Sequence, residues 1–215
     1  MSNDESPIFD LQFSMQTSLS PGDPNSHILK FEAAIMDLSL ETGLPQSTIG
    51  HFDVWRFNIE TYQKKDCGHL YDMFDAESEE VERLYTTLFD STGSSRIELD
   101  IDGFAFADDI LYFQWGHFPP DVRFSPVTLA AAERIIDCLG SGCAVTALWP
   151  WDKPEPDIKE ESSEHVFAYI ESQENHERHW GKIGFQRIQG TSILVRDMAN
   201  NGYEIRKILD DGYPS

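Results

Sequence analysis

Three residues with anion-binding chemistry stand close together in the sequence, around the expected start of a helix. Arg123, Ser125 and Thr128 offer a guanidinium and two hydroxyls, and Pro126 suits the first helical position. The amino end of a helix favours anions, because its first N–H groups have no acceptor in the helix and its dipole is positive there. The surrounding sequence is poor in other basic residues. The pattern therefore predicts a small positively charged site for a phosphate-like group around Arg123.

The elements that position this site are a strand, a helix and a second strand. Residues 109–118 are aromatic and aliphatic enough for a buried strand, and two prolines follow them. A helix over 126–139, with Ser125 as its N-cap, consists mostly of good helix formers. The short apolar run 143–149 is closed by a proline and reads as a second buried strand. We expect these two strands to be parallel neighbours that splay apart at the centre of a sheet.

The remaining sequence predicts hairpins and helices around this unit. Alternating residues predict a strand at 9–15 and a long antiparallel hairpin of strands over 27–40 and 47–59. An amphipathic helix is expected at 78–89, one helix or two at 165–183 with Gly184 as a left-handed C-cap, and a last hairpin at 185–188 and 191–196. We expect a mixed α+β fold with a mostly antiparallel sheet, as one domain of residues 1–215 with loose termini.

The charge and the cysteines restrict the function classes. Sixteen basic and 38 acidic residues give a net charge of −22, which argues against direct binding to nucleic acid or to an anionic membrane surface. Cationic partners would be attracted instead. The three cysteines form neither a disulfide framework nor a metal-binding set, so a reducing compartment and no metal are expected. With no long apolar run and an acidic amino end, the sequence predicts a cytoplasmic protein.

Two segments resemble motifs of the GNAT (GCN5-related) N-acetyltransferases. Residues 118–132, Phe-Pro-Pro-Asp-Val-Arg-Phe-Ser-Pro-Val-Thr-Leu-Ala-Ala-Ala, are similar to the family's P-x-x-R-G-x-G-x-G segment at the start of its acyl-CoA helix. Residues 179–185, His-Trp-Gly-Lys-Ile-Gly-Phe, are similar to the Y-Y-x-x-L-G-F that closes its last helix. Residues 140–151 also resemble the GGGC-x-x-x-L-x-P-x-P strand of a set of uncharacterised bacterial GNAT-like proteins. The resemblance covers about 28–197 and implies the GNAT fold.

The resemblance implies an acyl transfer from acetyl-CoA to an amine. It assigns the catalytic roles to His117, as the base on the central strand, and to His179, which replaces the family's tyrosine acid together with the neighbouring His176. The cofactor-binding residues that it implies are Phe118, Arg123, Phe124, Ser125, Val127 and Thr128.

The sequence departs from the family at the glycines of this turn. Phe124, Pro126 and Thr128 stand at the glycine positions, and Pro126 has no N–H to donate to a phosphate. Losing one charge-assisted hydrogen bond of about 1.5–3 kcal/mol would weaken cofactor binding about tenfold to a hundredfold. Arg123 and the hydroxyls of Ser125 and Thr128 would compensate in part.

Three functions therefore stay open. The first is an acyltransferase with weakened cofactor binding that acts on a cationic amine. The second is an inactive GNAT-like scaffold whose acidic surface binds a basic protein or mimics nucleic acid, which both the degenerate turn and the charge of −22 favour. The third is a binding module for a small cationic ligand. The sequence does not determine the oligomeric state.

Overall fold

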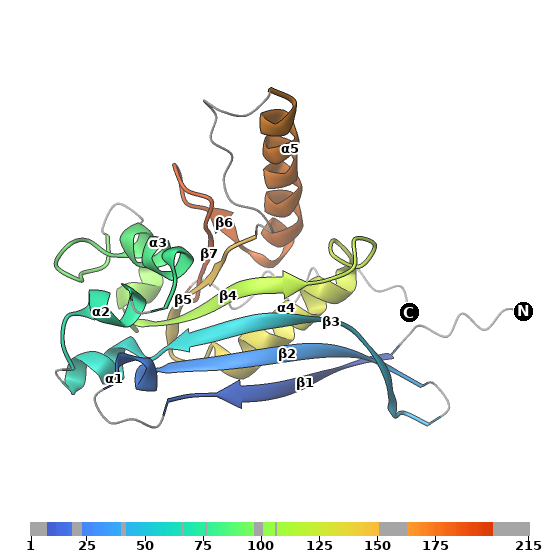
Figure 1. Cartoon of the computed structure of the whole chain (residues 1–215), viewed down its shortest axis with the longest axis horizontal. Coiled ribbons are helices and arrows are strands. Elements are labelled where there is room, and N and C mark those ends of the chain that lie inside the picture. The colour runs from blue at the N-terminus through green and yellow to red at the C-terminus, as the bar shows by residue number, and fades with distance from the viewer. Residues whose placement is uncertain are drawn as a thin grey trace, which may run out of the picture.

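A seven-stranded mixed sheet forms the centre of the computed structural model, which describes residues 8–18, 23–39, 42–65, 67–75, 77–96, 101–105, 107–150 and 163–199 (Figure 1). The strand order is β1-β2-β3-β4-β5-β7-β6. Among these strands, β4 and β5 form the parallel pair, and every other neighbouring pair is antiparallel. This arrangement confirms the predicted α+β class and the mostly antiparallel sheet.

The amino-terminal half of the sheet consists of three strands in sequence order. β1 spans Ile8–Gln16, β2 spans Ile28–Leu38 after a 3-10 turn at Pro24–His27, and β3 spans Pro45–Phe57. β2 and β3 form the long antiparallel hairpin predicted from the alternating residues, and β1 adds along the outside of β2. Because side chains alternate along a strand, each of these strands contributes to both faces of the sheet.

Three helices cover one end of one face. α1 (Ile59–Lys64), α2 (Leu70–Asp75) and α3 (Glu79–Leu88) pack their buried residues with Trp55 and Phe57 of β3 in one core. The hydroxyl of Ser78 accepts a hydrogen bond from the Val81 N–H and caps α3, as the predicted helix start requires. The sequence did not indicate α1 and α2, since six residues are too few to display a helical period.

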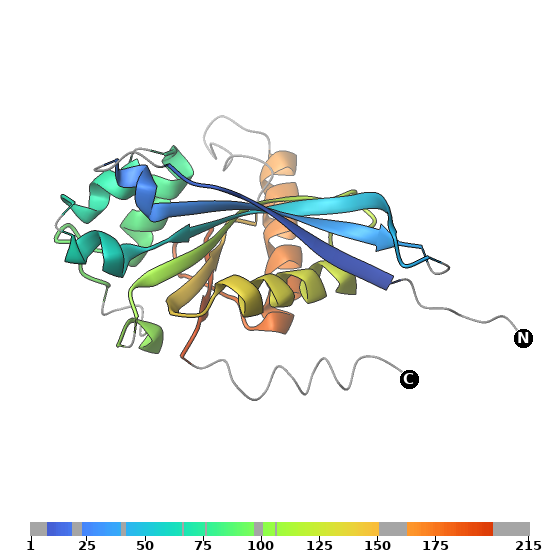
Figure 2. The ribbon, with the colours of Figure 1, turned by 90° about the horizontal axis from the view of Figure 1, so that it is seen from below.

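The predicted strand–helix–strand unit occupies the middle of the molecule. β4 spans Asp109–His117, α4 spans Pro126–Leu139 and β5 spans Cys143–Leu148, and a 3-10 turn at Asp102–Ala105 precedes them. α4 lies across the face of the sheet opposite to α1–α3, as the second view shows (Figure 2). Its buried residues form a second core with Phe52 and Val54 of β3.

The carboxyl-terminal part is one helix followed by a hairpin. α5 spans Ser163–Trp180 as one continuous helix, a 3-10 turn follows at Gly181–Ile183, and Gly184 ends the turn in the left-handed conformation with φ 86°. β6 (Gln186–Arg187) and β7 (Leu194–Asp197) form the last hairpin. Thus the predicted left-handed C-cap and the last hairpin are confirmed.

Some predictions cannot be compared with the structure. The expected loose ends, 1–7 and 200–215, lie outside the described residues, as do residues 151–162 of a loop that the prolines and acidic residues of 151–164 predict; residues 163–164 instead begin α5. No helix in the described part of the chain is long and apolar enough to cross a membrane.

Candidate functional site

β4 extends beyond the end of β5. β4 and β5 are paired from Asp109 to Phe113, where β5 ends at Leu148, and the Trp149 N–H donates to the Phe113 carbonyl at 3.2 Å. On its other side β4 stays paired with β3 as far as His117, but Gln114 is an extra residue between the partners of Val54 and Asp53. Such a bulge bends a strand and increases its twist. The structure thus contains the predicted parallel neighbours, while their splaying stays a prediction.

The loop between β4 and α4 uses three of its own N–H groups internally. Val122 and Arg123 both donate to the Pro119 carbonyl at 3.0 Å, and Ser125 donates to the Val122 carbonyl at 2.9 Å. Pro126 has no N–H. The first-turn groups of α4 that remain without an acceptor in the helix are those of Val127 and Thr128. Near the helix start, the described backbone can therefore offer an anion the N–H groups of Phe124, Val127 and Thr128.

Ser125 is the N-cap of α4, as predicted, but its hydroxyl does not cap the helix. Its Oγ is buried and has no hydrogen-bond partner among the described residues. A buried hydroxyl without a partner costs free energy, which a ligand or a water molecule at this position would recover. Arg123 is half-buried beside it. These two side chains are the predicted cofactor residues that the loop leaves closest to the amino end of α4.

Thr128 and His179 join α4 to α5. The Thr128 hydroxyl lies 2.8 Å from the Ser125 carbonyl oxygen, to which it can donate, and 3.0 Å from the His179 Nε2. The tautomer of His179 decides whether Thr128 or His179 donates in the second contact. Burial, with smaller effects of Lys182 and His176, lowers the pKa of His179 to about 4. At neutral pH this histidine is thus uncharged, and its hydrogen bond with Thr128 holds α5 against α4.

Phe124 and Phe118 have different surroundings, although both are predicted cofactor residues. The ring of Phe124 contacts the edges of His176 and His179, at centroid distances of 4.9 and 5.4 Å, and covers the junction of the loop with α5. Phe118 is buried and packs against Phe52 at 4.7 Å. A ligand at this loop would therefore meet the outer side of Phe124, while Phe118 supports the strands from within.

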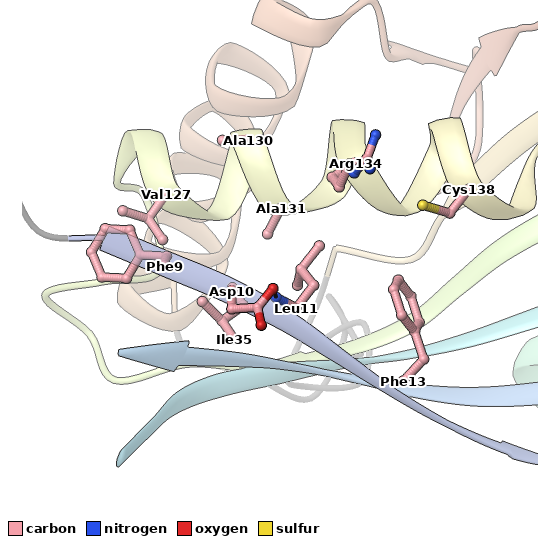
Figure 3. A pocket seen from close by; sticks show the side chains of 10 residues that line it. All are labelled: Phe9, Asp10, Leu11, Phe13, Ile35, Val127, Ala130, Ala131, Arg134 and Cys138. Atoms are coloured by element: carbon pink, nitrogen blue, oxygen red, sulfur yellow. Dashed lines mark hydrogen bonds between the residues drawn. The ribbon is translucent and has the colours of Figure 1, made fainter. Parts of the chain in front are cut away.

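The side chain of Val127, the last of the predicted cofactor residues, lines a groove between α4 and β1 (Figure 3). The groove has a volume of about 370 Å³, and its walls include Leu11 of β1 and Ala131 of α4, with Arg134 nearby. Any contact of Val127 with a phosphate at the helix start would thus use its N–H group alone.

His117 lies at the end of β4 in a cluster that the sequence analysis did not identify. Its Nε2 is 3.3 Å from the Asp53 Oδ2, and its ring stacks on His51 at 4.4 Å with an angle of 23°. The side chain of His117 is 51% exposed and that of Asp53 33% exposed. A carboxylate beside a histidine orients the ring, so His117 has the surroundings of a general base that is open to solvent.

The sequence-predicted residues are therefore divided between two places. The described structure brings Arg123, Phe124, Ser125, Thr128 and His179 together at the start of α4, whereas His117 lies with His51 and Asp53 on the sheet face that also carries Trp55. Because His51 and Asp53 are two residues apart in a predicted strand, the sequence indicates that they share a face of the sheet. It does not indicate which residue of the neighbouring strand lies beside them.

Comparison with known proteins gives no relative for this chain: no family model, no curated protein and no solved structure matches it.

Proposed function

We propose that this protein is an acyl-CoA-dependent N-acyltransferase of the GNAT type, with weak affinity for its cofactor and a cationic amine as its acceptor. The observation that supports the proposal is that β4 extends beyond its last pair with β5, Phe113 with Leu148, and leads through a short loop to the start of α4. An acyl-CoA needs an unpaired strand edge beside a helix start, since its thioester must reach the sheet while its phosphates stay at the helix.

The residues at the start of α4 fit this cofactor in part. Arg123 and the hydroxyl of Ser125 could bind its phosphates, together with the N–H groups of Val127 and Thr128. The N–H groups of Val122, Arg123 and Ser125 bind carbonyls of the loop, and the Thr128 hydroxyl binds Ser125 and His179. A site with so few donors supports weak binding. Acyl-CoA would supply the activated acyl group.

The catalytic part of the proposal rests on His117. An amine must lose a proton to attack a thioester, and a partly exposed imidazole next to a carboxylate can accept that proton. Asp53, at 3.3 Å, would orient the ring. The net charge of −22 would attract the cationic acceptor to this protein, which we place in the cytoplasm. His179 positions α5 in this scheme, because it is buried and bonded to Thr128.

A second function is favoured by the closed loop. The internal hydrogen bonds of residues 119–125 and the contact of Phe124 with α5 are what a scaffold without cofactor would have. In this alternative the acidic surface binds a basic protein, and the GNAT-like arrangement has no catalytic role.

The experiment is calorimetric titration of the protein with acetyl-CoA, with Arg123→Ala and Arg134→Ala as a matched pair. Both arginines carry the same charge on or beside α4, but Arg134 is exposed and lies in the third turn of the helix. We expect weak binding that Arg123→Ala reduces about tenfold or more, because a charge-assisted hydrogen bond contributes about 1.5–3 kcal/mol. Arg134→Ala should change the affinity less than threefold.

A further variant tests the argument from missing donors. Pro126→Gly restores an N–H group at the helix start, and Phe124→Gly opens the backbone beside it, so the double variant should bind acetyl-CoA more tightly. If neither the natural protein nor the double variant binds, the acyltransferase proposal is refuted and the scaffold remains. Tight binding by the natural protein would show that Arg123 and Ser125 are sufficient.

A further inference from the structure

We propose that His51, Asp53 and His117 bind one divalent transition-metal ion, with Zn²⁺ as the representative member of the class. Each residue offers one ligand atom, and these atoms all lie within 4.8 Å of one another. The site goes beyond the proposed acyltransferase: it shares His117 and Asp53 with the proposed base, but none of its evidence involves acyl-CoA or the start of α4.

The sheet fixes the three side chains on one face. His51 and Asp53 are two residues apart on β3, so both point to the same side. His117 on β4 is the direct partner of His51 in the antiparallel register. The three ligands thus come from two adjacent strands, and β3 is paired along both of its edges. A site built on a sheet is held more rigidly than one built on loops.

The distances approach those of a coordinated ion. Two ligands at about 2.0–2.1 Å from a tetrahedral ion are roughly 3.3 Å apart, and the Nε2 of His117 lies 3.3 Å from the Oδ2 of Asp53. The His51 ring stacks on His117 at 4.4 Å, and one ligand atom of His51 lies within 4.8 Å of those of Asp53 and His117. Binding of one ion would draw these three atoms closer together.

Two glycines keep the backbone of this site compact. A Cβ at Gly50 would lie 2.6 Å from the His117 carbonyl oxygen and 2.4 Å from the Phe118 ring, and one at Gly116 would lie 2.8 Å from the same ring. Phe118, which directly follows His117, therefore packs against the backbone immediately before His51. This packing fixes the ends of both strands where the two histidines meet, so the ligands are held close before any ion binds.

The donor set selects the class of ion. Mg²⁺ and Ca²⁺ prefer oxygen ligands, whereas two imidazoles with one carboxylate suit zinc, nickel, copper, cobalt and iron. Three protein ligands leave at least one coordination position open, and the exposure of His117 gives solvent access to it. The net charge of −22 raises the local concentration of any cation near the surface.

The test is titration of the metal-free, tag-free full chain with ZnCl₂ and, separately, with CoCl₂, whose visible absorption reports nitrogen and oxygen ligands. We expect one ion per chain, and we expect His51→Ala, His117→Ala and Asp53→Asn each to weaken binding at least about tenfold. Circular dichroism and the melting temperature of the metal-free variants establish that each of them is folded.

Three control variants separate this site from nonspecific binding. Glu32→Gln removes a carboxylate from the position opposite Asp53 on β2, and His69→Ala removes an exposed histidine elsewhere. Cys67→Ser disrupts a different pair of potential ligands, since the Cys67 Sγ lies 3.5 Å from the His27 Nε2. Each control should change the Zn²⁺ affinity less than threefold. No binding, or the same affinity in His51→Ala and His117→Ala as in the natural protein, would overturn the proposal, as would an equal loss in the controls.

Discussion

The buried neutral state of His179 makes the stability of this protein depend on pH. Its pKa falls from an ordinary value of 6.5 to about 4 in the folded protein, chiefly because burial disfavours the charged ring. The unfolded chain therefore binds a proton below about pH 6.5 that the folded chain does not bind until about pH 4. By linkage, this group lowers the stability as the pH falls through that window and has no effect above it.

The magnitude follows from the two pKa values. At pH 5 the difference amounts to about 2 kcal/mol relative to pH 7.5, and its limit below pH 4 is about 3 kcal/mol before allowance for solvent screening. With a urea slope of about 2 kcal/mol per molar, the midpoint should fall by up to about 1 M between pH 7.5 and pH 5. Other groups with shifted pKa values add to the dependence on pH, among them Glu133, whose pKa is raised chiefly by burial.

The assay therefore compares the natural protein with His179→Gln, in which the shared background cancels. Glutamine does not titrate, and its amide can still donate a hydrogen bond to Thr128. Between pH 7.5 and pH 5, the free energy of unfolding of the natural protein should fall by about 2 kcal/mol more than that of His179→Gln. His69→Gln, at an exposed position, should keep the natural dependence on pH. Parallel curves for the natural protein and His179→Gln would refute the buried, neutral state of His179.

Two further predictions concern packing, and both are measured by urea unfolding. Glu133→Ala should lower the free energy of unfolding by about 3 kcal/mol or more, because it leaves Arg196 buried without its partner. Glu133 and Arg196 form an ion pair at 2.5 Å, with side chains only 11% and 5% exposed. The double replacement of Glu133→Met with Arg196→Leu should change the stability little. A Glu133→Ala variant as stable as the natural protein would contradict this. Gly50→Ala should lower the free energy of unfolding by about 1–3 kcal/mol, because its Cβ would overlap the Phe118 ring. Gly181→Ala should lower it much less, because a Cβ at this position would have no atom of another residue within 4 Å among those compared. Equal losses in the two variants would contradict this reasoning.

The local sequence determined much of the fold. The parallel unit β4–α4–β5 could be predicted because prolines and glycines mark its ends and because each of its elements has a clear apolar pattern. The hairpin of β2 and β3 was predictable for the same reason. α1 and α2 were not, since helices of six residues depend on the apolar surface that the sheet offers them rather than on a period of their own.

The loop at the start of α4 shows why hydroxyl side chains can be misread. Thr128 was expected to replace a lost phosphate contact, and the structure instead joins its hydroxyl to Ser125 and His179. His179 lies 51 residues further along the chain. Which side chain meets the loop depends on how α5 returns to the sheet, and no local pattern around Thr128 contains this information.

The cluster around His117 depends on a single extra residue. Without Gln114 as a bulge, the register of β4 would shift by one position, so that His117 would lie opposite Gly50 and point to the other face. This bulge in the pairing of β4 with β3 is thus what places His117 beside His51 and Asp53. Both proposals depend on this bulge, yet they exclude each other at one atom, because the Nε2 of His117 cannot hold a metal ion and accept a proton from an amine at the same time. The two roles are therefore alternative states of one site.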